Sequence, residues 1–281
     1  MQKKIIFITR ILFVLSILLL IIFTTAFYAP RIGGNAQTMP NTVRTRAQLH
    51  AATRILNVTE DFYIEDTQFA SIRFTETDAD FISAINGSIN IFYPQLLTDF
   101  GLSLEEAGRM KIIIFPDQDT LESAVARRYT KMPMGMFFAG IIGITSPTVW
   151  FNGDNENIID NFMRNGPVLH EMVHFVLDVK TNGNHPLWFT EGVALFYEYI
   201  YTANEWRLDL RKEASQLCAI EVTTNFREFC KMISYRKVFD IIMNYVSTYG
   251  TEGLQKIITE LGRGTPYDEV LGNMVKLYRN T

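Results

Sequence analysis

Strong net charge and dense basic clusters are both missing from this sequence. Its 26 basic and 30 acidic residues leave a formal charge of −4, and no dense run of lysine and arginine follows residue 46. Proteins that bind nucleic acid through its phosphates carry a basic patch or stripe. The charge pattern therefore disfavours nucleic acid as a partner.

Cysteine is equally scarce, with only Cys218 and Cys230 in the chain. Their spacing does not match a cysteine zinc motif, so the pair is not expected to bind metal. A disulfide between them is chemically permitted if this part of the chain lies outside the cytoplasm. Because the sequence does not fix the distance between their α-carbons, a bonded pair and two separate buried thiols both stay open.

Low-complexity sequence and internal repeats are absent as well. Of 281 residues, 48% are hydrophobic and 13% aromatic, which is enough to build a packed core. About 250 residues remain after the N-terminal apolar stretch, a size that suits one domain. We therefore expect a single globular domain over residues 51–281.

The N-terminus carries a long apolar run. Three basic residues precede the stretch Ile11 to Phe23, and the wider segment Ile5 to Tyr28 is long enough to span a bilayer. The basic residues predict that the rest of the chain faces outward from the cytoplasm. Because a clean A-x-A cleavage site is missing, we favour an uncleaved membrane anchor in residues 1–29, with cleavage and secretion as the alternative.

Residues 30–50 contain proline, glycine and scattered polar residues without hydrophobic periodicity, which predicts a flexible stalk. Beyond it, short apolar runs bounded by turn residues predict strands at Phe62 to Ile64, Ile72 to Phe74, Lys111 to Phe115 and around Ile141 to Phe151. Helical spacing predicts helices at Asp78 to Phe100, Asp117 to Arg128, from Pro167 onward, Leu187 to Tyr201, Glu205 to Leu217, Tyr235 to Thr248, Thr251 to Leu261 and Pro266 to Tyr278. The predicted fold class is α+β, with a small mixed sheet and its helices followed by a helical half.

Histidine occurs only four times, yet two of the four lie in His170-Glu171-Met172-Val173-His174. Positions i and i+4 of a helix share one face about one turn apart, so both imidazoles can reach one zinc ion. Glu171, beside the first of them, can act as general base toward the attacking water and then protonate the leaving amine. A chance H-E-x-x-H is expected in under roughly one chain in a hundred of this composition.

A catalytic zinc needs a third protein ligand and keeps one position open for water. Glu191 follows the turn-rich segment Thr181 to Asn184 and lies near the start of the next predicted helix, Leu187 to Tyr201. This turn permits the chain to return so that the carboxylate reaches the histidines. Alone, Glu191 would be interpreted as a solvated glutamate in a first helical turn, but beside the paired histidines we predict a ligand.

The stretch H-E-M-V-H, followed by P-L-W-F-T-E-G-V-A-L-F-Y-E, resembles the peptidase MA-like zinc metallohydrolases, a branch of the gluzincins. The likeness extends over about residues 60–275 and is strongest from 167 to 200. It implies a zincin-like fold with His170, His174 and Glu191 as zinc ligands and Glu171 as the catalytic glutamate. Where this family often places an acidic residue, one turn after the third ligand, this chain has Leu195, so the groups that support the histidines are not identified.

The resemblance also implies an oxyanion donor besides the metal, at Tyr235 near a helix start. The competing tyrosines are Tyr197, Tyr201 and Tyr245. Each of the twelve tyrosines is more often an amphipathic packing residue than a donor.

Three further side chains are candidates close to the motif. His185 can line the cleft, although a loop histidine is more often solvated. Asp178, one turn beyond His174, and Glu198, two turns beyond Glu191, can orient the imidazoles, although exposed helix charges are the more frequent explanation. We place the edge that binds an extended peptide at Ile144 to Phe151, where Val149→Pro would reduce turnover without releasing zinc.

Together these patterns predict a membrane-anchored, extracytoplasmic zinc metallopeptidase that acts on peptides or proteins. The alternatives are a non-catalytic zinc-binding or structural module of the cell envelope and a regulatory membrane protein with an accidental motif. Glu171 favours the enzyme, because only catalysis requires that group. Substrate, cleavage preference and oligomeric state have no signal in the sequence.

Overall fold

The computed structural model describes residues 41–217 and 232–279. The chain divides into two compact units, Met1–Thr45 and Arg46–Thr281, and nearly all of the first lies outside the described residues. The anchor predicted in residues 1–29 and both cysteines lie outside them too. Within the described part, no helix combines the length and the apolar character needed to cross a bilayer.

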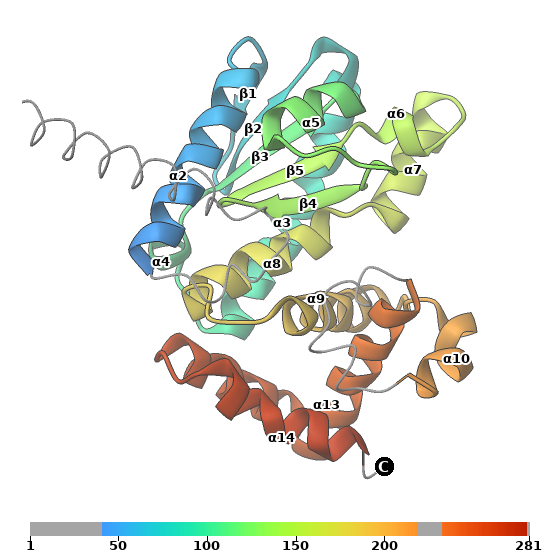
Figure 1. Cartoon of the computed structure of the whole chain (residues 1–281). Coiled ribbons are helices and arrows are strands. Elements are labelled where there is room, and N and C mark those ends of the chain that lie inside the picture. Colours follow the sequence, from blue (N-terminus) through green and yellow to red (C-terminus); the bar gives the residue numbers. More distant parts are fainter. Residues whose placement is uncertain (1–40, 218–231, 280–281) are drawn as a thin grey trace, which may run out of the picture. The chain divides into compact units, whose positions relative to one another are not determined.

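Five strands form one mixed sheet in the spatial order β1-β2-β3-β5-β4 (Figure 1). Strands β2, β3 and β5 are parallel to one another, whereas β1 and β4 run antiparallel at the two edges. The bounds are β1 (Tyr63–Asp66), β2 (Ala70–Phe74), β3 (Met110–Phe115), β4 (Gly135–Phe138) and β5 (Ile141–Thr145).

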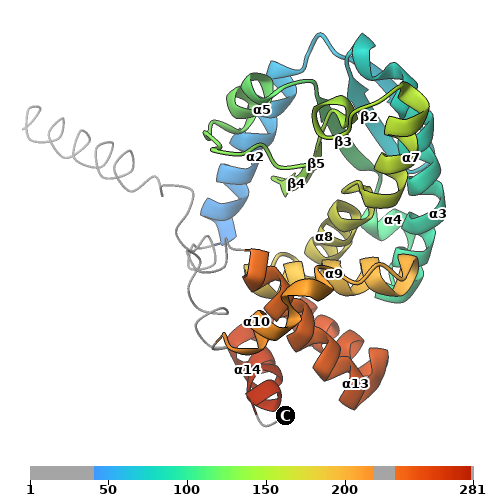
Figure 2. The same ribbon diagram turned by 90° about the vertical axis from the view of Figure 1, so that its right-hand side faces the viewer.

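Strand β3 shows why helices cover both faces of the sheet. Ile112 and Ile114 belong to one buried cluster, whereas Ile113 and Phe115 belong to a second. Successive side chains of a strand point to opposite faces, so a continuous apolar run fits a strand that is buried on both sides. Figure 2 shows α2 (Asn41–Val58) and α5 (Gln118–Val125) on one side of the sheet and α3 (Ile82–Phe100) on the other.

Helices dominate the chain after β5, which confirms the α+β prediction. The α-helices are α6 (Pro147–Trp150), α7 (Asn155–Asn165), α8 (Val168–Thr181), α9 (Leu187–Thr202), α10 (Arg211–Ser215), α13 (Met232–Gly262) and α14 (Tyr267–Arg279). Gly250, with φ 72° and ψ 175°, interrupts α13 at the break that the sequence predicts. The remaining short elements are η2 (Glu76–Phe81), α4 (Leu104–Ala107) and η3 (Leu208–Leu210).

Helix α8 lies in the interior, between the sheet and the helical half. Its apolar residues, from Val168 to Leu177, share one buried cluster with residues of the sheet, α3, α9 and α13. Each large apolar side chain that is removed from water contributes about 1.5–3 kcal/mol. Burial on several sides therefore holds α8 rigidly, as a precise binding site requires.

The strand predicted around Ile141 to Phe151 is only partly correct. Strand β5 ends at Thr145, and Pro147 begins the helical turn α6, because proline suits a first helical position. Val149 therefore lies in a helix, and β5 lies between β3 and β4. The edge strand of this part of the sheet is β4, so the predicted peptide-binding edge at Ile144 to Phe151 is wrong.

Two other predictions also need correction. Residues 41–50, expected as part of the stalk, belong to helix α2. The helix expected from Glu205 to Leu217 is reduced to η3 and α10. The reason is local, because Arg207 adopts a left-handed backbone with φ 39°, and the carbonyl of Trp206 accepts a hydrogen bond from the buried Arg236 instead of continuing a helix.

Candidate metal centre

Both histidines of the H-E-x-x-H motif lie in the first half of α8. Pro167 caps the start of this helix, and its carbonyl accepts a hydrogen bond from the amide of Glu171 at 2.9 Å. The spacing of four residues brings the rings of His170 and His174 to 4.7 Å between centroids. The motif therefore presents two imidazoles on one face of a buried helix.

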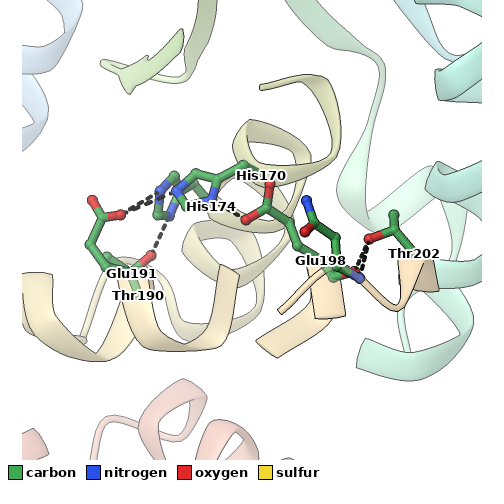
Figure 3. A network of polar contacts seen from close by, with 7 residues as sticks. His170, His174, Thr190, Glu191, Glu198 and Thr202 are labelled. Atoms are coloured by element: carbon green, nitrogen blue, oxygen red, sulfur yellow. Dashed lines mark hydrogen bonds and ion pairs between the residues drawn. The ribbon is translucent and has the colours of Figure 1, made fainter. Parts of the chain in front are cut away.

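Helix α9 brings Glu191 to the same place. Asn182, with a left-handed φ of 51°, ends α8, and the turn continues through Gly183. The side-chain amide of Asn184 then donates to the carbonyls of Leu261 and Thr265, which ties this turn to the junction of α13 and α14. After the turn, α9 packs against α8, and Glu191 faces the histidines (Figure 3).

The three predicted ligands come together around one point. Oε2 of Glu191 lies 3.1 Å from Nε2 of His170 and 3.6 Å from Nε2 of His174. The candidate ligand atoms of the three residues all lie within 4.8 Å of one another. Zinc bonds of about 2.0–2.1 Å at tetrahedral angles place ligand atoms roughly 3.4 Å apart. The spacing of these atoms thus suits a zinc ion.

The second ring nitrogen of each histidine, Nδ1, also has a polar partner. Nδ1 of His170 lies 3.1 Å from Oε2 of Glu198, and Nδ1 of His174 lies 2.7 Å from Oγ1 of Thr190 (Figure 3). Such partners set the tautomer and the orientation of an imidazole, so that its opposite nitrogen faces the metal. Here both Nε2 atoms face Glu191.

Sequence reasoning found these supporting residues only in part. The sequence offers Glu198 as a candidate but favours an exposed helix charge there, whereas the structure places it behind His170. Its distance of seven residues from Glu191 is two helical turns, which places both carboxylates on one face of α9 and was the available signal. Thr190 was not identified, because a threonine beside a ligand carries no recognisable pattern.

Burial and charge shift the pKa values at the centre. Burial lowers the pKa of His170, but the carboxylates of Glu198 and Glu191 raise it by more, so it lies well above that of an ordinary histidine. For His174, burial dominates and lowers the pKa. Burial tends to raise the pKa of Glu191, but the charge of His174 and hydrogen bonds from both histidines bring it well below its usual range. The centre thus favours a positive charge between its carboxylates.

Glu171 is a buried acid beside this group. Glu171 is 4% exposed, and its Oε2 has no hydrogen-bond partner among the described residues. Burial raises the pKa of its carboxyl group to about 8, and the charges of Glu191 and Glu198 add to the effect. Buried polar atoms are normally satisfied, so an orphaned carboxylate oxygen next to candidate metal ligands fits a site for a cation with its water.

The other candidates near the motif have different partners. His185 is not a solvated loop residue, because its side chain is only 12% exposed and its Nε2 lies 3.6 Å from Oδ1 of Asp178. The hydroxyl of Tyr201 donates to Asp99 at 2.7 Å, so it is engaged away from the histidines. Tyr235 lies in α13 with its ring centroid 6.5 Å from that of Trp206. Its predicted role as oxyanion donor stays a prediction.

Tyr197 and Tyr245 are the two remaining tyrosines that the sequence left open. Tyr197 is 3% exposed and packs within α9 against Phe196 and Tyr201. The ring of Tyr245 lies 4.8 Å from that of Tyr249. Both therefore have packing contacts that suit amphipathic core residues.

Comparison with known proteins assigns no family to this chain. No family model matches the sequence, and no curated protein matches it. What the centre can do is therefore inferred from its residues and their geometry.

Glu198 is expected to strengthen metal binding by holding His170. Replacing it by glutamine removes the charge behind Nδ1, and loss of such a partner typically weakens metal affinity about 10–100-fold. Zinc affinity can be measured on the full chain by competition with a chromophoric chelator. Glu213→Gln, which changes an exposed carboxylate on α10, is the matched control. Equal affinities for the two variants would show that Glu198 does not support the site.

Glu171 is expected to make the metal-free protein less stable as the pH rises. Below pH 4.5 the carboxyl group is protonated in both states, whereas above it the unfolded chain releases the proton and the folded chain holds it up to a pH of about 8. Stability therefore falls across this window. With chelator present, the melting temperature of Glu171→Gln should exceed that of the wild type by an increasing margin between about pH 5 and 8. A constant margin would contradict the assigned burial of this charge.

Proposed function

We propose that this chain is a membrane-anchored, extracytoplasmic zinc metallopeptidase with a zincin-like fold. The observation that carries the proposal is the convergence of His170, His174 and Glu191 beside the buried carboxyl group of Glu171. Two imidazoles and one carboxylate form the ligand set of a hydrolytic zinc site, and the glutamate beside the first histidine is the general base of such sites. The apolar segment in residues 1–29 supplies the anchor in this proposal.

His170, His174 and Glu191 hold the metal, with Glu198 and Thr190 fixing the two imidazoles. Zinc bound there would act as a Lewis acid, supplying a nucleophilic water near neutral pH and polarising the carbonyl of the scissile bond. Because Glu198 and Thr190 hold the two Nδ1 atoms, both Nε2 atoms already face Glu191.

Glu171 supplies the acid–base chemistry. Its carboxylate accepts a proton from the attacking water and then delivers that proton to the leaving amine. Burial raises its pKa to about 8 in the metal-free site, and a dication bound nearby would lower that value again. A pKa brought close to neutrality suits a group that must both take up and release a proton in each cycle.

Strand β4 is the proposed docking edge for the peptide. Among the described residues it pairs only with β5, so its other side is an open sheet edge. The amide of Thr145 donates to the carbonyl of Met134, and antiparallel pairs alternate between bonded and unbonded positions. The main-chain groups of Gly135 and Phe137 consequently face the open edge, where an extended peptide can pair with them.

A non-catalytic metal-binding module of the cell envelope is the alternative. Glu171 is the observation that separates the two, because a buried carboxyl group without a partner for Oε2 costs free energy and holds no ligand in place. Selection for a structural metal site gives no reason to retain it. The enzyme is therefore the better supported of the two proposals.

Hydrolysis of a mixed peptide library tests the proposal directly. The wild type should bind one zinc ion and cleave peptides, whereas Glu171→Gln should retain zinc and lose about 10²–10⁴-fold in kcat. His174→Ala should lose both zinc and cleavage. A wild-type chain that binds zinc and cleaves nothing would support the non-catalytic module, and full activity in Glu171→Gln would remove the proposed base.

Pairing with β4 predicts that every second backbone amide of the bound peptide is needed for cleavage. Once a cleaved peptide is known, each of its backbone amides in turn can be N-methylated. Methylation at alternate positions should abolish cleavage, because those amides pair with the strand, whereas the intervening positions should tolerate it. Equal tolerance at every position along the peptide would contradict binding by strand addition.

A further inference from the structure

One face of β4 is directed toward α8, and its other face lies on the opposite side of the sheet. The side chain of Met136 packs with the second core cluster, together with Phe115 and Phe138. Phe137 points the other way, and its ring meets that of Phe175 in α8 edge to face, with centroids 6.2 Å apart at 81°. Because side chains alternate along a strand, Gly135 lies on the same face as Phe137.

Two residues along β4 cover nearly the same distance as four residues along α8. Two residues along a strand cover about 6.6 Å, and four residues along a helix cover about 6 Å. Glu171 and Phe175 are four residues apart in α8, whereas Gly135 and Phe137 are two apart in β4. The contact between the two phenylalanines therefore places Gly135 over Glu171.

The contact between Gly135 and Glu171 leaves no room for a side chain. A Cβ atom at position 135 would lie 2.8 Å from Oε1 and 2.9 Å from Cγ of Glu171, and 2.6 Å from Cβ of Pro167. Optimal separations between such atoms are about 3.5–4.0 Å. Gly135 is not among the residues with positive φ, so the requirement for glycine comes from the close approach and not from the backbone conformation.

We propose that Gly135 is a positioning residue for Glu171. The bare backbone of β4 forms a wall against which the carboxyl group rests, and the contact of Phe137 with Phe175 sets the position of that wall. The main chain of Gly135 also faces the open edge, so one residue both contacts the base and pairs with the peptide. This assignment rests on the proposed function for its catalytic consequence, whereas the contact itself does not.

Gly135→Ala in the full chain tests the catalytic consequence. Displacement of Glu171 by the new methyl group should lower kcat by roughly 10–100-fold, the loss expected for a catalytic group misplaced by about 1 Å. KM and zinc content should stay near their wild-type values, and the acidic limb of the pH profile should shift. The control is Gly87→Ala, where no heavy atom lies within 4 Å of the added carbon. Unchanged kcat in Gly135→Ala would overturn the proposal.

Thermal unfolding of a double-mutant cycle tests the contact without any substrate. Gly135→Ala should lower the melting temperature of the wild type by roughly 2–10 °C, and by less in a Glu171→Ala background, which lacks both Cγ and Oε1. Equal losses in the two backgrounds would overturn the contact. A chain with Gly135→Ala that folds only when Glu171 is truncated would support it.

Phe137→Leu completes the test if Gly135→Ala folds in neither background. It keeps an apolar side chain but removes the ring that sets the strand over α8, so kcat should fall while zinc is retained. Full kcat in Phe137→Leu would then overturn the proposal. The two proposals can fail separately. If the effects of Gly135→Ala and Glu171→Ala on unfolding are coupled but the wild type cleaves no peptide, the contact is supported and the proposed function is rejected.

Discussion

The candidate metal centre depends on one interface, the apolar packing of α8 against α9, which brings two imidazoles to a single carboxylate oxygen. Charged groups are costly to remove from water and remain buried only when they are paired and hydrogen-bonded. Oε2 of Glu191 meets both Nε2 atoms, and Glu198 and Thr190 meet both Nδ1 atoms, so each ring is held at its two ends. Around this polar seam the surfaces of α8 and α9 are apolar, and they form part of the main core cluster. The hydrophobic burial that fixes the helices is therefore also what fixes the geometry of the centre.

The central part of the site was predictable, because helical periodicity alone places His170 and His174 on one face. Glu191 needed one more inference, that a turn of glycine and asparagine returns the chain. The groups that support the two histidines were harder to predict. Glu198 follows from the same periodicity once Glu191 is taken as a ligand, but its charge is equally compatible with a solvated helix surface. Thr190 and the packing of Gly135 against Glu171 depend on how separate elements meet, which no local pattern contains.

In the sheet, too, one strand could be predicted from the sequence and another could not. Strand β3, a continuous apolar run, was recognisable because burial on both faces leaves that signature. Strand β4 was missed: it has four residues, and the turn that joins it to β5 uses Ala139 and Gly140, both with positive φ. Two-residue hairpins of this kind normally carry asparagine, aspartate or glycine at the first position. Alanine there removed the usual signal, and the proposed peptide edge was assigned to the wrong strand as a result.

The hydrogen bonds of Asn184 have a consequence for biosynthesis. Its side-chain amide joins the turn between α8 and α9 to carbonyls that lie 77 and 81 residues further along the chain. During synthesis this turn has no such tether until the chain has been translated through Leu261 and Thr265, and a fragment that ends before Thr265 lacks the second hydrogen bond. Helices α8 and α9 are thus made before the segment that ties the turn between them in place. The candidate metal centre therefore gains this support only after Leu261 and Thr265 have been made.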